Sequence, residues 1–320
     1  MVYELRERIL DYKSFISIVK QRVKSRLGDN YSVEIYKVIK NNSLELDSLV
    51  LLKKGKNFTP SIYLQPYYES YLWGTTIEDI VERLCSIYHH CSIPIVNKTF
   101  TYDFEEMKAF IIYRLVSYEK NKKLLATVPH KKYLDLAITY HCLVRDDVDG
   151  IGTIRICNNH LDKWKVSIQD IDILATVNTP QLMPATINTI DEVIRKILCS
   201  EMAAGNLNGI SSDNLEEILS INDMHNNYNM YILSNHKGIN GAACILYSDV
   251  IHDFAKQINS DLYILPSSIH EVILVPKGPG IDKRVLRKMV QDVNRTQVPP
   301  EEVLSDRVYY YSREYNGIIC

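Results

Sequence analysis

The stretch from Leu262 to Pro276, LYILPSSIHEVILVP, constrains the fold of this chain more than any other part of it. Two runs within it, Leu262 to Leu265 and Glu271 to Val275, are rich in β-branched and aliphatic residues, which predicts two short strands. A polar connector, Pro266 to His270, separates the runs and holds the densest group of potentially reactive side chains in the sequence. We therefore take this pair of strands as the centre around which the rest of the chain is organised.

Helical and extended patterns follow one another along the whole sequence, which predicts an α+β protein. Apolar residues at helical spacing cover Leu5 to Leu27, a segment from a cap at Thr75 or Thr76 to about His89, Asp103 to Glu119, Thr189 to Met202 and Ile281 to Val293. Extended patterns cover Tyr31 to Val38, Leu46 to Leu52, Pro60 to Leu64 and Val308 to Tyr311. We expect the last of these to be an edge strand, preceded by a short helix from Glu301 to Leu304.

The segment Asn121-Lys122-Lys123 interrupts these patterns and is the predicted domain boundary. Residues 1–120 would form an N-terminal module of helices and strands, and residues 121–320 a C-terminal α+β body. Within that body, Leu124 to Tyr140 is a candidate hairpin that turns at Pro129 to Lys132.

The C-terminal body also contains a candidate internal repeat. Residues 140–176 match residues 230–266 in character, with Ile156 on Leu246 and Trp164 on Phe254. Each copy would hold a hairpin with a Gly-rich turn, an amphipathic helix and an Ile-Leu strand. Two related β-hairpin-α-β units would then pack into one body. The alternative is a chance similarity between two such units.

Composition argues against several classes of protein. A net charge of −2 gives no overall attraction to nucleic acid or anionic lipid. The amino terminus is charged from Glu4 onward, unlike a secretory signal, and the apolar runs are shorter than the roughly 20 residues of a membrane span. The 7 cysteines are odd in number and lack framework spacing, which predicts seven unpaired thiols in a cytoplasmic protein.

Tyrosine and lysine usage bear on the partner of the chain. The sequence holds 22 Tyr against 6 Phe, and residues 1–57 hold 12 Lys and Arg against 7 Asp and Glu. Tyrosine suits half-buried surfaces, where the ring packs and the hydroxyl stays hydrated. A solvated helix face and lysines on an edge strand explain the positive charge more simply than a nucleic-acid site. We therefore expect a protein partner in preference to nucleic acid, with the oligomeric state left open.

Four blocks of sequence are familiar as a set. They are PSIYLQPYYESYLWGTTIEDI (Pro60 to Ile80), NMYILSNHKGINGAACILYSDVI (Asn229 to Ile251), ILPSSIHEVILVP (Ile264 to Pro276) and VNRTQVPPEEVLSDRVYYY (Val293 to Tyr311). Together they resemble an uncharacterised bacterial family of domains of unknown function, associated with anaerobic Gram-positive genomes and often with mobile elements. A looser similarity links the chain to a second uncharacterised family of bacterial cytosolic proteins. The resemblance implies a cytosolic protein and carries over no activity and no catalytic residues.

Ser267, Ser268, His270 and Glu271 are the candidate catalytic residues. A nucleophilic serine needs a base within hydrogen-bond reach and an oxyanion hole. On an extended chain Ser268 and His270 share a face but lie about 7 Å apart, and Glu271 points to the opposite face. No Gly-x-Ser-x-Gly motif accompanies them. The alternative is a tight connector whose polar side chains satisfy backbone amides, with His270 in a structural role.

A Gly-rich loop that enters a helix can hold an anion on its backbone amides. The candidate anion-binding residues are therefore Lys277, Gly278, Gly280, Lys283 and Arg284. The loop lacks the phosphate-binding spacing GxxxxGK[ST], and Asp282 is placed to cap the helix instead.

For metals, Cys85 and His89 stand one helical turn apart near His90 and Cys91, but no CxxC pair accompanies them. A buried thiol beside a helix-terminal histidine is the simpler interpretation, so we predict no metal and no cofactor.

The sequence therefore predicts a non-catalytic binding or regulatory protein. The alternative is a hydrolase or other small-molecule enzyme that uses His270 with Ser267 or Ser268. These two hypotheses differ in where His270 should lie. In an enzyme it should line a deep pocket with a second polar group within about 3 Å, and in a binding protein it should lie in a surface turn or be packed.

Overall fold

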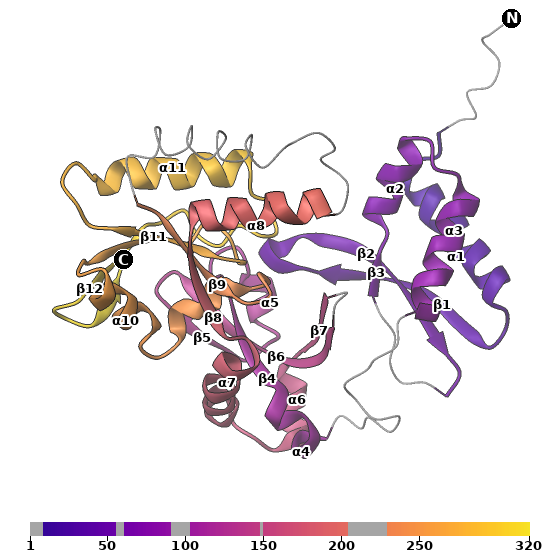
Figure 1. Cartoon of the computed structure of the whole chain (residues 1–320). Helices are drawn as coiled ribbons and strands as arrows, with labels where there is room; N and C mark the ends of the chain where they lie inside the picture. The colour runs from indigo at the N-terminus through magenta and orange to yellow at the C-terminus, as the bar shows by residue number, and fades with distance from the viewer. Residues whose placement is uncertain (1–8, 56–60, 91–102, 148–149, 204–228) are drawn as a thin grey trace, which may run out of the picture. The chain divides into compact units, whose positions relative to one another are not determined.

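The computed structural model describes residues 9–55, 61–90, 103–147, 150–203 and 229–320 (Figure 1). The chain divides into two units, Met1–Pro94 and Ile95–Cys320, and each is described by itself. Both combine helices with antiparallel sheets, so the protein is α+β, as predicted. None of the helices in the described ranges is long and apolar enough to cross a membrane.

The first unit begins with helix α1 (Tyr12–Leu27), followed by a long hairpin (Figure 1). Asp11 caps α1 by accepting a hydrogen bond from the Ser14 amide at 2.8 Å, and Gly28 follows at a φ of 75° that favours glycine. Strands β1 (Tyr31–Ile39) and β2 (Glu45–Lys53) then pair antiparallel across the turn η1 (Asn41–Ser43). These elements confirm the two predicted strands. The helix begins at Tyr12 rather than at Leu5, because residues 9–11 are not helical, and Leu5 to Arg8 lie outside the described residues.

Strand β3 (Ser61–Tyr63) pairs with β2 and completes a three-stranded sheet, sheet A, in the order β1-β2-β3. Helices α2 (Gln65–Leu72) and α3 (Ile77–His90) follow, and the Thr76 hydroxyl accepts a hydrogen bond from the Asp79 amide at the start of α3. The core of the unit is formed by α1, α3 and one face of sheet A, through Phe15, Val19, Val23, Val33, Leu49, Leu51, Ile62, Ile80 and Leu84.

The second unit contains a four-stranded sheet, sheet B. Its strands are β4 (Ile111–Ser117), β5 (His130–Tyr133), β6 (Leu136–Asp147) and β7 (Gly150–Arg155), with β4 and β5 on either side of β6 and β7 also paired to β6. The hairpin expected within Leu124 to Tyr140 is present, but it turns at Leu134 and Asp135 rather than at Pro129 to Lys132.

The helix predicted from Asp103 to Glu119 is wrong. The segment forms a short helix α4 (Phe104–Met107), a turn η2 (Lys108–Phe110) and then strand β4. Because β4 buries residues on both faces, its apolar run is continuous rather than alternating, and Phe104, Met107, Ile111 and Leu115 happen to fall at helical spacing. Pairing of β4 with β6 places this segment in the second unit, ahead of the expected boundary at residue 120.

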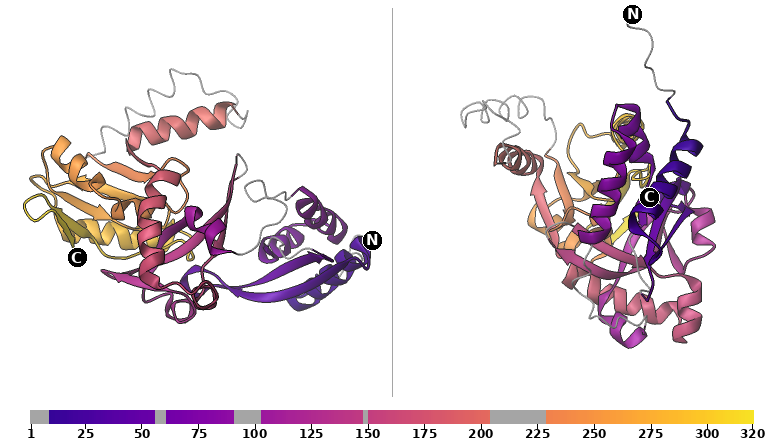
Figure 2. Two further views of the ribbon diagram at one scale, coloured as in Figure 1. Left: turned by 90° about the horizontal axis from the view of Figure 1, so that it is seen from below. Right: turned by 90° about the vertical axis from the view of Figure 1, so that its right-hand side faces the viewer.

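A six-stranded antiparallel sheet, sheet C, forms the rest of the second unit, and its strands lie side by side in both views of Figure 2. The order is β13 (Gly317–Ile319), β12 (Tyr309–Ser312), β10 (Leu262–Leu265), β11 (Val272–Pro276), β9 (Tyr231–Asn235) and β8 (Ala185–Thr189). The stretch from Leu262 to Pro276 thus supplies the two central strands, β10 and β11, as predicted. Strand β12 is not at the edge as expected, because β13 pairs with its far side.

Helices and turns cover both faces of these sheets. They are α5 (Lys122–Leu125), α6 (Asn158–Trp164), α7 (Ile168–Leu182), α8 (Ile190–Ala203), η3 (Gly241–Leu246), α10 (Val250–Gln257) and α11 (Lys283–Thr296). The main core joins sheet B, through residues such as Tyr113 and Tyr140, to sheet C, through Ile264 and Leu274. On the other face of sheet C, Leu286 and Val290 of α11 pack against Val275.

The two segments of the candidate repeat do not share one order of elements. Residues 140–176 contain two strands and then two helices, whereas residues 230–266 contain a strand, a 3-10 turn, a helix and a strand. The Ile-Leu run expected as a strand in the first copy lies in α7, where Ser167 and Asp170 form a reciprocal cap. The superposition expected of a repeat is therefore not found.

Six cysteines lie in the described part of the chain, and all six are free thiols: Cys85, Cys142, Cys157, Cys199, Cys244 and Cys320. Burial raises the pKa of Cys142 and of Cys244 to about 12. These two thiols therefore stay protonated and unreactive at neutral pH. Cys91 lies outside the described residues.

Candidate functional site

The connector between β10 and β11 is held in extended form by the segment from Glu302 to Ser305. The Ile269 amide donates to the Glu302 carbonyl, the Leu304 amide to the Ser267 carbonyl and the Ser305 amide to the Pro266 carbonyl, each at 2.9 Å. Ser268 also forms a bridge with Val303. The helix predicted from Glu301 to Leu304 is therefore wrong, because the backbone groups of this segment pair with the connector.

His270 lies where the connector meets two other parts of the second unit. Its Nδ1 accepts a hydrogen bond from the Asn240 amide at 3.3 Å, and its Nε2 lies 3.4 Å from Oε1 of Glu302. Its own carbonyl accepts a hydrogen bond from the Ser234 hydroxyl at 2.7 Å. His270 thus joins the start of β11 to the end of β9, to the turn before η3 and to Glu302.

The two candidate serines are buried, and neither is a described partner of the His270 ring. The Ser268 hydroxyl oxygen accepts a hydrogen bond from the backbone amide of His270 at 2.9 Å. The same hydroxyl donates to the Glu271 carboxylate, although a regular strand would turn Glu271 to the opposite face. Residues 266–271 are not a regular strand, and this irregularity brings the two side chains together.

Burial raises the pKa of the Glu271 carboxyl, while the hydrogen bond from Ser268 and the neighbouring His270 act in the opposite direction. The arrangement therefore contains a carboxylate–imidazole pair, Glu302 with His270, and a separate hydroxyl–carboxylate pair, Ser268 with Glu271. These two pairs hold the irregular connector in one conformation.

Gly241 lets β9, η3 and the connector approach one another closely. It begins η3, and a Cβ atom placed there would lie 2.6 Å from the Asn235 amide nitrogen and 2.6 Å from the His270 carbonyl oxygen. Asn240, just before it, has a φ of 54° in the left-handed region, which asparagine tolerates better than most residues. The close approach lets the Ala242 amide reach the Ile269 carbonyl at 3.2 Å.

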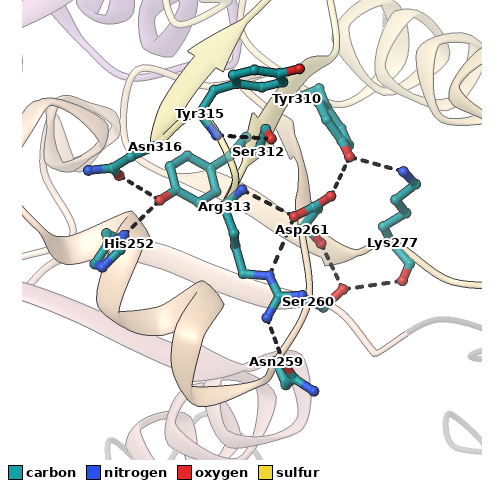
Figure 3. A network of polar contacts seen from close by, with 11 residues as sticks. His252, Asn259, Ser260, Asp261, Lys277, Tyr310, Ser312, Arg313, Tyr315 and Asn316 are labelled. Carbon is teal, nitrogen blue, oxygen red and sulfur yellow. Dashed lines mark hydrogen bonds and ion pairs between the residues drawn. The ribbon is translucent and has the colours of Figure 1, made fainter.

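The candidate anion-binding residues are not assembled into one site. Lys277 turns toward β12, where its Nζ donates to the Tyr310 hydroxyl at 3.0 Å (Figure 3). Asp282 caps α11 by accepting a hydrogen bond from the Arg284 amide at 2.8 Å. A carboxylate therefore occupies the helix end that an anion would need, near Gly278, Gly280 and Lys283.

Lys277 belongs to a network around Asp261 (Figure 3). The Tyr310 hydroxyl donates to Asp261 at 2.5 Å, and the Arg313 amide donates to the same carboxylate at 3.1 Å. These hydrogen bonds lower the pKa of Asp261, with that of Tyr310 contributing most. Two other pairs of the same kind are Tyr140 with Asp172, at 2.8 Å, and Tyr309 with Asp135, at 2.6 Å. Some of the tyrosines in this sequence thus donate hydrogen bonds to aspartates of the same chain.

The candidate zinc ligands do not form a described cluster. Cys85 is buried on α3, and burial raises the pKa of its thiol. The side chains of His89 and His90 lie outside the described residues, as does Cys91. Within the described ranges, there is no group of three or more His, Cys, Asp and Glu side chains that could hold a metal ion.

Sequence reasoning missed a pocket in the second unit, between sheet B and the turn that follows β9. Its lining includes Arg114 on β4, Ile151 on β7, Met183, Ile239 and Asn240, and it is a small, partly open pocket with room for about one water molecule. One signal was present in the sequence. Arg114 interrupts an otherwise apolar run, Ile111 to Val116, and arginine is rarely placed in a buried strand without a role.

Sequence reasoning also missed the outer face of sheet A, which is the face opposite α1 and α3. Tyr36, Ser48 and Tyr63 lie in one row across its three strands, because Tyr36 pairs with Ser48 and Ser48 with Tyr63. Four aliphatic residues lie beside this row on the same face: Val38, Leu46, Val50 and Leu52. None of these residues belongs to the core of the first unit. Tyr36 is 56% exposed and Leu52 37%.

Replacing His270 with alanine is expected to lower the free energy of unfolding by about 1–2 kcal/mol, because the Asn240 amide and the Glu302 carboxylate each lose a partner. The melting temperature should fall by a few degrees in thermal denaturation. His236→Ala is the matched control, because His236 is exposed next to the same turn. If His270→Ala melted at or above the wild-type temperature, the structural role of His270 would be wrong and the enzyme hypothesis would gain.

Residues 12–313 match a family of unknown function, DUF5688. Searches of curated proteins and of solved structures gave no match.

Proposed function

The chain belongs to the family of unknown function DUF5688, and we propose that it is a non-catalytic binding or regulatory protein that holds a protein partner on the outer face of sheet A. The observation that carries this proposal is the row of Tyr36, Ser48 and Tyr63 with its aliphatic neighbours. These side chains lie on the face of sheet A opposite the core formed with α1 and α3, where Tyr36 and Leu52 are exposed and Ser48 is buried.

The chemistry of this strip suits a protein surface. Tyrosine is enriched at protein interfaces, because its ring buries a large area at low entropic cost and its hydroxyl can still form a hydrogen bond. Ser48 lies between Tyr36 and Tyr63 in the row and is fully buried. Val50 and Leu52 extend the same surface along β2. A partner with an apolar strip or an aliphatic helix face would complement it.

The charges of the first unit favour a protein over nucleic acid. Three of the five basic residues of α1 form ion pairs: Lys20 with Glu34 at 2.7 Å, Arg22 with Glu78, and Arg26 with Glu82 at 3.9 Å. Local carboxylates therefore neutralise much of the positive charge that the sequence concentrates here. Nucleic-acid binding depends on lysine and arginine that are available to phosphates.

The alternative hypothesis is a hydrolase that uses His270 with Ser267 or Ser268. The pair formed by Glu302 and His270 favours it, since a carboxylate beside an imidazole is one part of a catalytic triad. Against it, the described contacts of the His270 ring are with Asn240 and Glu302 rather than with a serine hydroxyl.

The double variant Tyr36→Ala, Leu52→Ser tests the proposal. We expect host proteins that copurify with the wild-type chain, identified by mass spectrometry, to be recovered about tenfold less with this variant, because two exposed side chains of this face are removed. Both residues are exposed and outside the core, so the circular dichroism spectrum and melting temperature should stay close to wild type.

Trp73→Ala is the matched control, since Trp73 is 91% exposed in the same unit and does not belong to sheet A. Its partner recovery should equal that of the wild type. The proposal is wrong if the double variant and the control recover the same proteins in equal amounts, or if no host protein is enriched over an unrelated bait.

A further inference from the structure

Helix α11 carries an exposed cationic surface in a chain whose net charge is −2. Its 14 residues hold five lysines and arginines and one acidic residue, Asp292. All five cations are exposed to solvent: Lys283, Arg284, Arg287, Lys288 and Arg295. Positive charge is therefore concentrated on one helix of the second unit, while the rest of the chain is acidic.

Most of these side chains form a row along the solvent side of α11. Arg284, Lys288, Gln291 and Arg295 follow one another at spacings of four, three and four residues, which puts them on one face of the helix, and Arg287 lies beside them. We call these five residues the α11 row. At about 1.5 Å of rise per residue, the row is about 16 Å long from Arg284 to Arg295.

The other side of α11 is buried against sheet C. Leu286 and Val290 pack with Val275, and Asn294 is buried one turn further along the helix. These contacts hold α11 on the sheet and leave the α11 row to solvent. A helix that adsorbs to a lipid surface buries its apolar face in the bilayer, and the apolar face of α11 is already packed on the protein.

The cations of α11 are available to a ligand. Lys283, Arg284, Arg287 and Lys288 form no ion pair within the ranges that the structure describes, and Arg295 has Asp292 at 3.0 Å. Like charges four residues apart on a helix repel each other, and α11 contains two such pairs, Lys283 with Arg287 and Arg284 with Lys288. An anionic partner with several charges would relieve this repulsion, because it would place a counter-charge beside each cation.

The composition of the row favours the phosphates of nucleic acid as that partner. A length of about 16 Å spans several phosphates of one strand, which follow one another at about 3.4 Å along the axis of a duplex. Three of the five cations are arginines, whose forked donors match phosphate oxygens. Single strands are usually held by stacking on aromatic side chains, and α11 contains no aromatic residue. A duplex is therefore the better match.

We propose that the α11 row binds the phosphate backbone of double-stranded nucleic acid. The side chains along the helix make the contacts, and the helix end does not, because the Asp282 carboxylate caps it. Gln291, in the middle of the row, offers an amide that can reach a base edge. This surface belongs to the second unit and is separate from the sheet A surface, so either proposal can fail without the other.

The test uses the full chain and a fluorescein-labelled DNA duplex of about 20 base pairs, with binding followed by fluorescence anisotropy at about 50 mM sodium chloride. We expect micromolar binding that weakens steeply as salt is raised, because each neutralised phosphate releases counterions. No binding up to about 100 µM protein would overturn the proposal. Tighter binding to a single strand of the same length, to poly-glutamate or to phosphatidylserine vesicles would assign a different partner and would also overturn it.

The double variant Arg284→Gln, Lys288→Gln should bind the duplex at least tenfold more weakly, and the slope of log K against log salt should become shallower by about 2. Both side chains are exposed and glutamine keeps helix propensity, so the melting temperature should stay close to that of the wild type. Lys13→Gln, Lys24→Gln is the matched control, since it removes the same charge from exposed positions of α1. Equal losses in the two double variants would show that net charge, rather than α11, governs binding and would contradict the proposal.

Discussion

Gly241→Ala is expected to destabilise the second unit by more than about 3 kcal/mol, the largest effect of any single substitution considered for this protein. The added Cβ would lie 2.6 Å from both the Asn235 amide nitrogen and the His270 carbonyl oxygen. These are backbone atoms of β9 and of the connector, so neither can rotate away as a side chain could. The clash must separate two segments that His270 and Ser234 hold together.

Thermal and urea denaturation followed by circular dichroism measure this effect. Gly278→Ala is the matched control, because its Cβ would meet only the Ile281 side chain, at an ordinary distance of 3.7 Å. We expect that control to stay within about 0.5 kcal/mol of the wild type. A Gly241→Ala chain as stable as Gly278→Ala would show that the junction of β9, η3 and the connector is looser than described.

Tyr309→Phe is expected to cost about 2 kcal/mol. The Tyr309 ring is fully buried in the main core, and its hydroxyl donates to the Asp135 carboxylate at 2.6 Å. Asp135 lies in the turn between β5 and β6, so this hydrogen bond links sheet B to β12 of sheet C. Hydrogen bonds to a charged group contribute about 1.5–3 kcal/mol, and burial excludes water as a substitute donor.

Tyr310→Phe provides the comparison, since Tyr310 follows directly on the same strand and its hydroxyl donates to Asp261 in the same way. Tyr310 is only partly buried, so water can replace the lost hydroxyl, and we expect a cost below about 1 kcal/mol. Urea midpoints of the two variants measure the difference. Equal losses would contradict the view that burial, rather than the hydrogen bond alone, sets the contribution of Tyr309.

Local signals in the sequence predicted several elements well. Asp282 caps α11 as expected, and the first unit forms the predicted hairpin as β1 and β2, although the start of α1 at Asp11 was not predicted. In each case the deciding interaction lies within a few residues along the chain, such as a side chain that accepts from an amide in the next turn. Such contacts can be read from sequence because no distant partner is needed.

Strand β4 could not be predicted in this way. Its residues are buried on both faces by parts of the chain that are far away in sequence, including Thr179, whose hydroxyl accepts from the Tyr113 amide at 3.1 Å. Without that information, Phe104 to Leu115 matches a helical spacing as well as an extended one. Tertiary contacts, rather than local preference, decided between the two.

The candidate site was predicted in part. The connector and its flanking strands were recognised, but the partners of His270 were not, because Asn240 and Glu302 come from segments about thirty residues before and after it. The position of Arg114 in the register of sheet B depends in the same way on pairing between strands. An arginine in an apolar run signals an unusual environment, and only the fold shows which groups share its face.

The position of β12 in sheet C has a consequence for synthesis of the chain. Strand β10 pairs with β11 on one edge and with β12 on the other, and β12 is translated more than thirty residues after β11. Until β12 emerges from the ribosome, β10 presents an unpaired edge beside Leu262 and Ile264. Nascent chains can associate through such edges, and a chaperone can recognise them. We expect ribosome-bound chains that end between α11 and β12 to be the species most prone to aggregate.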